Sequence, residues 1–499
     1  MPYGLDNPIY DPFNHIIDKK DDEAPVKHIA FPTPHQISDS EYEALISKLN
    51  HKQYQFLNVV QDSLIEGETF YCTLSGPAGT GKSHLITAIT QSLLRHFNSI
   101  PGNNPESLKV LLCAPTGKAA FNIGGITLHA ALSLPVSQYG EELIPLHHDT
   151  VNTIYCNLYD LKLIIIDEYS MVGARLFDHI NSRLQQIFKS DAIFGNISII
   201  LCGDNRQLPP VRDMYIFCPV KTNPYKELCG TYLWDHFKYF ELSEIMRQSE
   251  DKSFAVALNN MAFGKMTDED VQLIKSREVD SIDQIPEDTM HLFCTNAEVD
   301  TFNEMKLSTF KTERAVDAKY MISMNVDTSD GIVNGATGIL RQIDYDRSKI
   351  PFRVWMEFFD SKSGQECRKR NESLRKSMGV LYTWTPIERA ARAVKIQKGS
   401  NVYVERLQFP LIISEGITIH KSQGATYKQV AVHIGNRMTR TSTYVACSRA
   451  TKLSGLYIIG KFKAPKPATE KDAAYKELEI KIEDDITTLI QLWYRSFQK

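Results

Sequence analysis

The sequence lacks several features that would assign it to a simple class. No apolar run approaches the roughly 18 residues that a membrane span needs, so we expect no membrane association. The nine cysteines form no Cys-x-x-Cys pair, which argues against structural zinc and favours free thiols in a reducing compartment. The chain does not open with a basic stretch followed by an apolar one, so we expect no secretory signal. We therefore expect an intracellular location. Repeats at solenoid periods are also missing.

Net charge is small, which at first argues weakly against a nucleic-acid partner. Fifty-six Lys and Arg stand against 60 Asp and Glu, for a formal charge of −4. The charges are unevenly distributed, because residues 1–50 hold nine acidic residues and four lysines. Residues 361–400 hold ten Lys and Arg against three Glu, with Tyr382 and Trp384 among them. Nucleic-acid binding therefore stays open, with the basic stretch as a candidate track or, equally, a solvated face.

The length of 499 residues suggests about three domains. Residues 1–37, rich in proline and acids, are predicted to be a poorly ordered leader. Apolar strand candidates then alternate with helical patterns, which predicts an α/β fold with parallel sheets. The first α/β domain is expected at 38–215 and the second at 216–317 and 411–460, with 238–244 as its first strand. A small β-domain is expected at 318–410 and a C-terminal helix at 461–499.

A glycine-rich segment follows the strand candidate at 69–75 and precedes a helical pattern. It fits the pattern GxxxxGK[ST], in which backbone amides and a helix N-terminus bind phosphates. Lys82 would reach the β- and γ-phosphates of a nucleotide, and Ser83 would offer a hydroxyl to Mg²⁺. The expected ATP-binding residues of this loop are Gly76, Pro77, Ala78, Gly79, Thr80, Gly81, Lys82 and Ser83.

Two acidic residues end the apolar strand candidate at 163–168. Asp167 would complete the Mg²⁺ site together with Ser83, and Glu168 would polarise the attacking water. The loop and the acid pair together predict a nucleotide hydrolase.

The ordered motifs resemble those of superfamily 1 helicases, and in detail the petite-integration-frequency (Pif-type, RecD-like) family. Seven segments carry this resemblance, namely 76–83, 114–120, 127–129, 167–172, 203–211, 418–424 and 444–450. The resemblance implies two RecA-like domains with ATP between them, a single DNA strand across both, and an inserted Src-homology-3-like barrel with a turn at 334–338.

The resemblance also implies roles around the nucleotide. Gln207 would couple nucleotide state to movement, and Arg247 and Arg449 would be arginine fingers for the transferred phosphate. Gln53 would read the adenine edge, unless it is a solvated helix residue, and Gly424 would line the ATP site. Where the family carries an aromatic, this chain has Asn205-Arg206, and Arg206 is either a substitute phosphate contact or exposed.

Polar residues at strand ends are the implied contacts to the DNA backbone, which predicts sequence-independent binding. They are Pro115, Thr116, Gly117, Lys118, Thr127, His129, His420, Lys421 and Ser422. For His129 and His420 a packing role stays open.

The sequence therefore predicts an ATP- and Mg²⁺-dependent 5′→3′ DNA helicase acting on single-stranded and forked duplex DNA, in repair, recombination or replication. Its polarity rests on the resemblance. A translocase that displaces proteins without unwinding, and an RNA-directed helicase, are the alternatives. A strand-separating pin is expected near 130–160. Because the expected substrate is DNA, we expect the protein in the nucleus or wherever that DNA resides. The sequence leaves the oligomeric state open.

Overall fold

The computed structural model describes residues 15–17, 31–135, 143–218, 233–244, 251–309, 316–395 and 403–467. The chain divides into two compact units, a large unit of residues 29–302 and 416–499 and a small unit of residues 1–28 and 303–415. Residues 461–467 are not helical, and the rest of the expected C-terminal helix lies outside the described residues.

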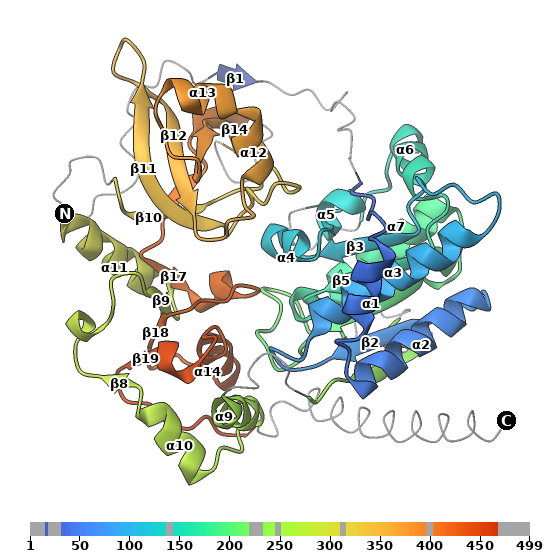
Figure 1. The fold of residues 1–499 in the computed structure, drawn as a ribbon, viewed down its shortest axis with the longest axis horizontal. Coiled ribbons are helices and arrows are strands. Elements are labelled where there is room, and N and C mark those ends of the chain that lie inside the picture. The colour runs from blue at the N-terminus through green and yellow to red at the C-terminus, as the bar shows by residue number, and fades with distance from the viewer. Residues whose placement is uncertain are drawn as a thin grey trace. The chain divides into compact units, whose positions relative to one another are not determined.

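A six-stranded parallel sheet forms the first half of the large unit (Figure 1), with strand order β4-β3-β5-β6-β2-β7. Every pairing in it is parallel, as the continuous apolar runs predict. Its strands are β2 (Tyr71–Ser75), β3 (Val110–Ala114), β4 (Ile126–Thr127), β5 (Leu163–Asp167), β6 (Ser198–Gly203) and β7 (Lys238–Glu241).

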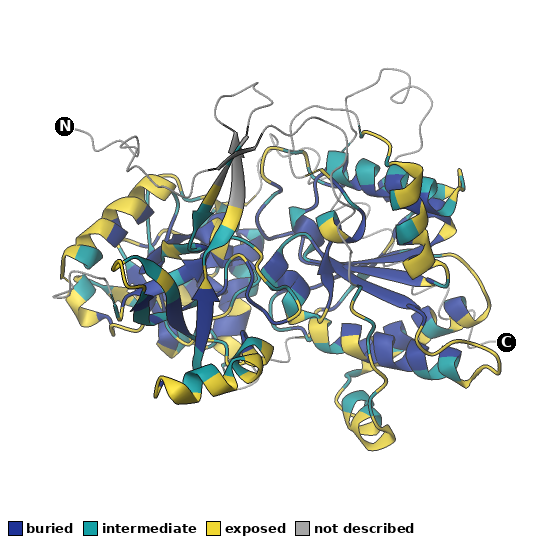
Figure 2. Ribbon diagram, turned by 90° about the horizontal axis from the view of Figure 1, so that it is seen from above, coloured by how far each residue is buried: buried dark blue, intermediate teal, exposed yellow. Residues whose placement is uncertain are grey.

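Helices cover both faces of this sheet because alternate residues of each strand point to opposite sides. Leu163 and Ile165 of β5 pack with helices α2 and α3, whereas Ile164 and Ile166 pack with α6 and α7. Figure 2 shows the buried strands in dark blue and exposed residues on the outer faces of the helices. The helices of this half are α1 (Asp39–Ile46), α2 (His51–Ile65), α3 (Lys82–Ser99), α4 (Gly117–Asn122), α5 (Leu128–Ala131), α6 (His148–Leu158) and α7 (Ala174–Phe188).

Strand β7 corrects the assignment made from the sequence, which gave residues 238–244 to the second series of strands. The structure pairs β7 in parallel with β2, with Cys72 opposite Lys238, and the amide of Leu242 donates to the carbonyl of Ser75 at 2.8 Å. The first sheet therefore extends past residue 215. A short apolar strand carries no local mark of its partner, so its sheet is decided by tertiary packing.

A five-stranded parallel sheet forms the second half of the large unit, with strand order β17-β9-β18-β19-β8. Its strands are β8 (Glu278–Val279), β9 (Met290–Phe293), β17 (Gly416–Thr418), β18 (Val430–His433) and β19 (Leu456–Ile459). The accompanying helices are α9 (Lys252–Phe263), α10 (Asp268–Lys275), α11 (Asn296–Thr309), which runs on into the small unit, and α14 (Arg440–Cys447).

The small unit contains antiparallel sheets. Five strands pair in the order β13-β12-β11-β10-β16, and three in the order β1-β15-β14. The strands are β1 (His15–Ile17), β10 (Lys319–Ile322), β11 (Thr337–Tyr345), β12 (Pro351–Phe358), β13 (Trp384–Glu388), β14 (Ala390–Lys395), β15 (Tyr403–Gln408) and β16 (Leu411–Ile413). Two helices interrupt the expected run of strands and turns, α12 (Gln365–Arg370) and α13 (Glu372–Ser377).

The leader is more structured than its composition suggests. Strand β1 pairs antiparallel with β15, with His15 opposite Glu405. Nearer the first sheet, the amide of Ile37 donates to Gln91 at 2.9 Å, and Gln91 in turn donates to the carbonyl of His35 at 2.8 Å. Long-range backbone pairing therefore orders parts of residues 1–37 that local composition predicts to be disordered.

Candidate active site

The glycine-rich loop joins β2 to α3 in the strand-loop-helix arrangement that the sequence predicts. Gly79 and Gly81 have φ angles of 90° and 79°, which other residues rarely adopt. These turns let α3 begin at Lys82. The Lys82 ammonium donates to the carbonyl oxygens of Gly76 at 2.6 Å and Pro77 at 3.0 Å. The lysine thus lies over the loop whose amides can hold a phosphate.

Gln53 is buried against this loop and is not a solvated helix residue. Its side-chain oxygen accepts from the amide of Asn50 at 2.9 Å, which caps α2. Its side-chain nitrogen donates to the carbonyl of Thr80 at 2.9 Å. The amide that was expected to read adenine therefore joins α2 to the phosphate loop.

The acid pair stands at the carboxyl end of β5, two strands from the loop. Burial and the neighbouring Glu168 raise the pKa of Asp167 to about 7. Burial also raises the pKa of Glu168, and the charges of Arg449 and Lys82 oppose that rise. One carboxylate oxygen of Glu168 is buried with no hydrogen-bond partner among the described residues. A carboxylate in this state is suited to accept a proton from a bound molecule.

Gln207 follows β6 and is buried. The side-chain nitrogen of Gln423, next to Gly424, lies 3.5 Å from the Gln207 oxygen and donates to Ser170 at 3.3 Å. A side chain added to Gly424 would approach Glu168, because a Cβ at that position would lie 3.9 Å from a Glu168 carboxylate oxygen. Residues that follow strands of both sheets therefore meet beside the acid pair.

Arg449 follows α14 and is 5% exposed. Its guanidinium donates to the carbonyls of Val445 and Ala425, each at 3.0 Å, while its charge lowers the pKa of Glu168. It is thus a buried cation near the acid pair. Arg247, the other expected finger, lies outside the described residues.

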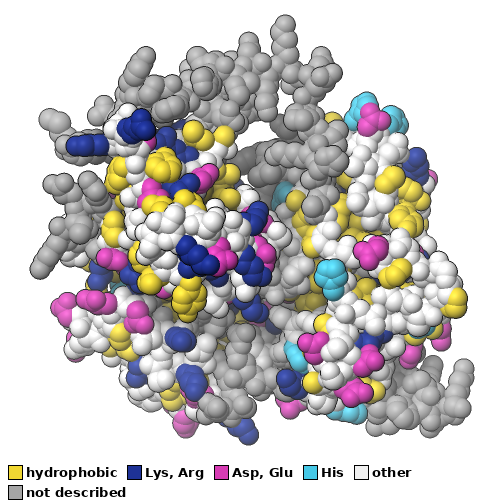
Figure 3. Space-filling view, turned by 45° about the horizontal axis from the view of Figure 1, so that its top comes forward, with side chains coloured by type: hydrophobic (Ala, Val, Ile, Leu, Met, Phe, Trp, Pro, Cys, Tyr) yellow, Lys and Arg dark blue, Asp and Glu magenta, His cyan; other side chains and the backbone are white. Residues whose placement is uncertain are grey.

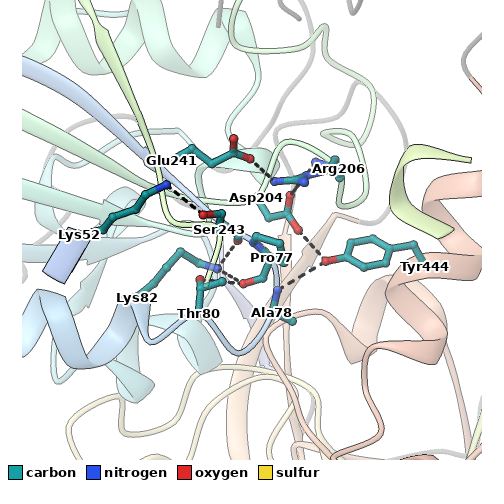
Figure 4. A network of polar contacts seen from close by, with 11 residues as sticks. Lys52, Pro77, Ala78, Thr80, Lys82, Asp204, Arg206, Glu241, Ser243 and Tyr444 are labelled. Carbon is teal, nitrogen blue, oxygen red and sulfur yellow. Dashed lines mark hydrogen bonds and ion pairs between the residues drawn. The ribbon is translucent and has the colours of Figure 1, made fainter. Parts of the chain in front are cut away.

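Arg206 is buried in a network that joins the two sheets of the large unit (Figure 4). It pairs with Asp204 at 3.1 Å and with Glu241 at 2.8 Å. The Tyr444 hydroxyl from α14 donates to the other Asp204 oxygen at 2.8 Å and accepts from the amide of Ala78, 3.5 Å away. Because Arg206 is only 6% exposed, the interpretation of it as a solvent-exposed residue is wrong.

The expected DNA contacts of the first sheet lie where its strands end. Pro115, Thr116, Gly117 and Lys118 follow β3, and Thr116 caps α4 by accepting from the amide of Ala119 at 3.3 Å. Thr127 caps α5 in the same way. His129 lies within α5, and burial lowers its pKa. The two hydroxyls are thus engaged in capping, and the backbone amides there remain candidates for phosphate contacts.

The second sheet supplies the matching set after β17. Thr418 caps the turn that holds His420, Lys421 and Ser422. His420 and Lys421 are exposed, whereas the Ser422 hydroxyl is buried and donates to the carbonyl of Ile419 at 2.7 Å. A cavity of about 470 Å³ borders His420, with Arg437 and Arg440 among its lining residues.

The basic stretch of the small unit is partly neutralised by local ion pairs. Lys369 pairs with Glu366 and Lys376 with Glu372, each at 2.7 Å. Figure 3 shows Asp and Glu side chains in magenta beside Lys and Arg in dark blue on one face of the molecule. Both glutamates are among the three already counted for residues 361–400, so these pairs leave the excess of Lys and Arg in that stretch unchanged.

Two functional candidates escaped sequence reasoning. Tyr444 and Gln423 both lie in motifs that carried the resemblance, yet neither was assigned a role. Their hydrogen bonds to Asp204 and Ser170 cross between segments more than 200 residues apart. Their place inside dense motifs was the available signal.

Membrane-spanning helices and metal clusters are both missing from the described part of the chain. None of its helices is long and apolar enough to cross a membrane. Across the same residues, no cluster of three or more His, Cys, Asp or Glu could hold a metal ion.

Comparison with known proteins finds similarity to PIF1-like helicases. Residues 48–272 match the model for PIF1-like helicases. The ATP-dependent DNA helicase PIF1 of Danio rerio is 29% identical over 457 residues, 83% of this chain and 61% of that protein. That of Emericella nidulans is 28% identical over 474 residues, 81% of this chain and 60% of that protein. The chain thus spans about three fifths of the length of these helicases.

Solved structures share the fold. The Pif1 helicase from Candida albicans has a TM-score of 0.62 at 24% identity, covering 86% of this chain and 99% of that one. A Pif1 helicase from Bacteroides in complex with ADP-AlF3 and single-stranded DNA has a TM-score of 0.60 at 23% identity, covering 88% and 98%. The α/β architecture with parallel sheets is therefore that of Pif1 helicases.

Proposed function

Because residues 48–272 match the PIF1-like helicase model, we propose that this chain is an ATP-dependent DNA helicase that moves 5′→3′ on single-stranded DNA and unwinds duplexes. The observation that carries the proposal is the meeting of two sheets around one acid pair. Lys82 and Asp167 come from the first half of the large unit, and the Arg449 charge that acts on Glu168 comes from the second half. Hydrolysis at such a junction can change the relative position of the two halves of the large unit.

In the proposed reaction, Lys82 exchanges its loop carbonyls for the β- and γ-phosphates of ATP. Glu168, whose free oxygen lacks a partner among the described residues, orients the attacking water. Gln207 senses the γ-phosphate, and Arg449 supplies charge to the transition state, with Arg247 as the second finger. An arginine of this kind contributes about 10³–10⁵ in rate.

Mg²⁺ fits the residues at this edge. Ser83 is exposed at the start of α3, and Asp167 ends β5, so a hydroxyl and a carboxylate oxygen are available to a cation that prefers oxygen ligands. Bound there, Mg²⁺ would neutralise charge on the β- and γ-phosphates. Gly424 and the loop residues 76–81 would line the nucleotide, and Gln53 would act by holding the loop.

Single-stranded DNA is the proposed track, along Pro115–Lys118 and Thr127–His129 of the first sheet and His420–Ser422 of the second. Two such sets, one per sheet, suit alternating grip during translocation. The exposed His420 and Lys421 support this, and backbone-directed contacts predict binding without sequence preference.

The domain plan is also a proposal. Two RecA-like domains would carry the two parallel sheets, and the antiparallel sheets of the small unit would be a Src-homology-3-like insert. The pin expected near 130–160 falls partly on α6 and partly on 136–142, which lie outside the described residues.

The test is unwinding of DNA duplexes with a 5′ or a 3′ single-stranded tail, given ATP and Mg²⁺. We expect unwinding of the 5′-tailed duplex and none by Lys82→Ala or Glu168→Gln. Unwinding of only the 3′-tailed duplex contradicts the polarity. Activity that survives in Lys82→Ala contradicts the mechanism.

Two further arms separate the alternatives. Removal of a protein bound to single-stranded DNA, without duplex unwinding, would instead indicate a translocase. Preference for a 5′-tailed RNA duplex would indicate an RNA-directed helicase.

A further inference from the structure

Tyr444 is a buried phenol of the second half of the large unit, and its hydroxyl contacts the glycine-rich loop of the first half (Figure 4). It lies in α14, only 1% exposed. Its oxygen accepts from the amide of Ala78 at 3.5 Å, and its proton goes to Asp204 at 2.8 Å. Burial and the Asp204 carboxylate raise the pKa of Tyr444 far above its ordinary value, so the hydroxyl keeps the proton that it donates.

Asp204, the acceptor of this hydroxyl, is fully buried and held by an ion pair. Arg206 pairs with Asp204 at 3.1 Å and with Glu241 of β7 at 2.8 Å, and β7 lies beside the strand that leads into the loop. The Arg206 guanidinium also lies 4.7 Å from the centre of the Phe263 ring in α9. These contacts therefore connect the glycine-rich loop, through Tyr444, Asp204 and Arg206, with β7 in the first half of the large unit and α9 in the second.

The amide of Ala78 belongs to the loop whose N–H groups hold phosphates in this type of motif. It cannot donate fully to a phosphate and to Tyr444 at once. We propose that Tyr444 is a positioning residue that competes with nucleotide for the Ala78 amide and thereby links loop occupancy to α14. This inference rests on the proposed nucleotide site.

The link has a consequence for hydrolysis, because Arg449 lies two residues past the end of α14 and Gln207 follows Asp204 in one turn. When nucleotide takes the Ala78 amide, the Tyr444 hydroxyl keeps only its Asp204 partner among the contacts described. Nucleotide binding would thus change the contacts of α14, the helix that precedes Arg449, and of Asp204, which lies in the same turn as Gln207.

The test is the affinity of Tyr444→Phe for ADP with Mg²⁺, measured by titration calorimetry on the full chain. Phenylalanine keeps the ring and removes only the hydroxyl. A neutral hydrogen bond of ordinary net strength corresponds to about a two- to tenfold change, so we expect Kd to fall by that factor. In steady-state hydrolysis we expect both KM for ATP and kcat to fall. Partial unfolding would lower the apparent kcat and leave KM unchanged.

Tyr71→Phe is the matched control, because it also removes a tyrosine hydroxyl. Tyr71 begins β2, the strand that leads into the loop, and its hydroxyl donates to the carbonyl of Ile193 at 2.7 Å. Its ADP affinity should equal that of the wild type. Unchanged affinity in Tyr444→Phe overturns the inference. If Tyr444→Phe does not fold, Asp204→Asn replaces it, with a smaller fall in Kd expected and an unchanged Kd overturning the inference. A wild-type chain that binds no ADP overturns the proposed function itself.

Discussion

At the scale of single residues, burial decides what a polar side chain can do. Arg206 belongs to the Asn205-Arg206 pair found where the family resemblance implies an aromatic, and its guanidinium is enclosed by Asp204, Glu241 and the ring of Phe263. Because Asp204 is itself fully buried, the pair is strongly interdependent. Removing one partner of such a pair leaves an uncompensated charge in the interior.

Arg206→Gln should therefore destabilise the protein by about 3–5 kcal/mol. The free energy of unfolding in urea measures this loss. Arg370→Gln is the control, since the Arg370–Asp327 pair is at the surface, with the arginine side chain 65% exposed, and its loss should barely move the unfolding midpoint. Equal effects of the two substitutions would contradict the buried role of Arg206.

His433 gives a pH dependence at the same scale. It stacks on Phe293 with ring centres 4.0 Å apart and shares a hydrogen bond of 2.9 Å with His291. Burial lowers its pKa to about 4, while the nearby Glu298 opposes this. The unfolded chain, with an ordinary pKa near 6.5, binds the proton first as pH falls.

The stability that His433 contributes is therefore complete above about pH 6.5 and is lost as pH falls towards 4. His433→Phe keeps the stacked ring and cannot titrate. Its melting temperature should change less than that of the wild type between pH 4 and 6.5. An identical pH profile in both proteins would show that other groups account for the acid sensitivity.

At the scale of elements, the phosphate loop depends on what lies beside it. Gly76 follows β2 where the chain after β7 passes close, so a Cβ there would be 2.7 Å from the Thr80 hydroxyl and 2.8 Å from the carbonyl oxygen of Leu242. Backbone cannot yield at such distances without moving β7 or the loop. The pairing of β7 with β2 thus sets the shape of the proposed nucleotide site.

Gly76→Ala should lower the affinity for ADP at least tenfold and destabilise the protein by roughly 1–3 kcal/mol. Calorimetric titration and urea unfolding test the two effects. Gly435→Ala is a suitable control because its Cβ would meet only a Glu298 oxygen at 3.4 Å. Normal ADP binding by Gly76→Ala would refute this account of the loop.

At the scale of the whole molecule, charge is concentrated in segments while the total stays near zero. The small unit carries the basic stretch, and Lys369 and Lys376 extend from α12 and α13 with side chains 65% and 70% exposed. Their partners Glu366 and Glu372 are also exposed, so these ion pairs are weak and can exchange for phosphates. A DNA track there would show in the salt dependence of binding.

Neutralising Lys369 and Lys376 together, by Lys→Gln, should reduce the slope of log affinity for single-stranded DNA against log salt by about 1.4. Binding at several NaCl concentrations measures the slope. Lys349→Gln, on the turn between β11 and β12, should leave it unchanged. An unaltered slope in the double variant would remove these two lysines from the track.

Short segments of the sequence are enough to predict the chemistry of the proposed nucleotide site. The turn of the phosphate loop, the acids at the end of β5 and the α/β alternation depend on local spacing and backbone freedom, which neighbouring residues specify. Which distant segments meet became known only from the folded chain. Folding assigned β7 to the first sheet, turned the Gln53 amide onto Thr80, buried Arg206 and brought Tyr444 to Ala78. Those contacts depend on which surfaces pack together, and residue spacing along one chain carries no record of them.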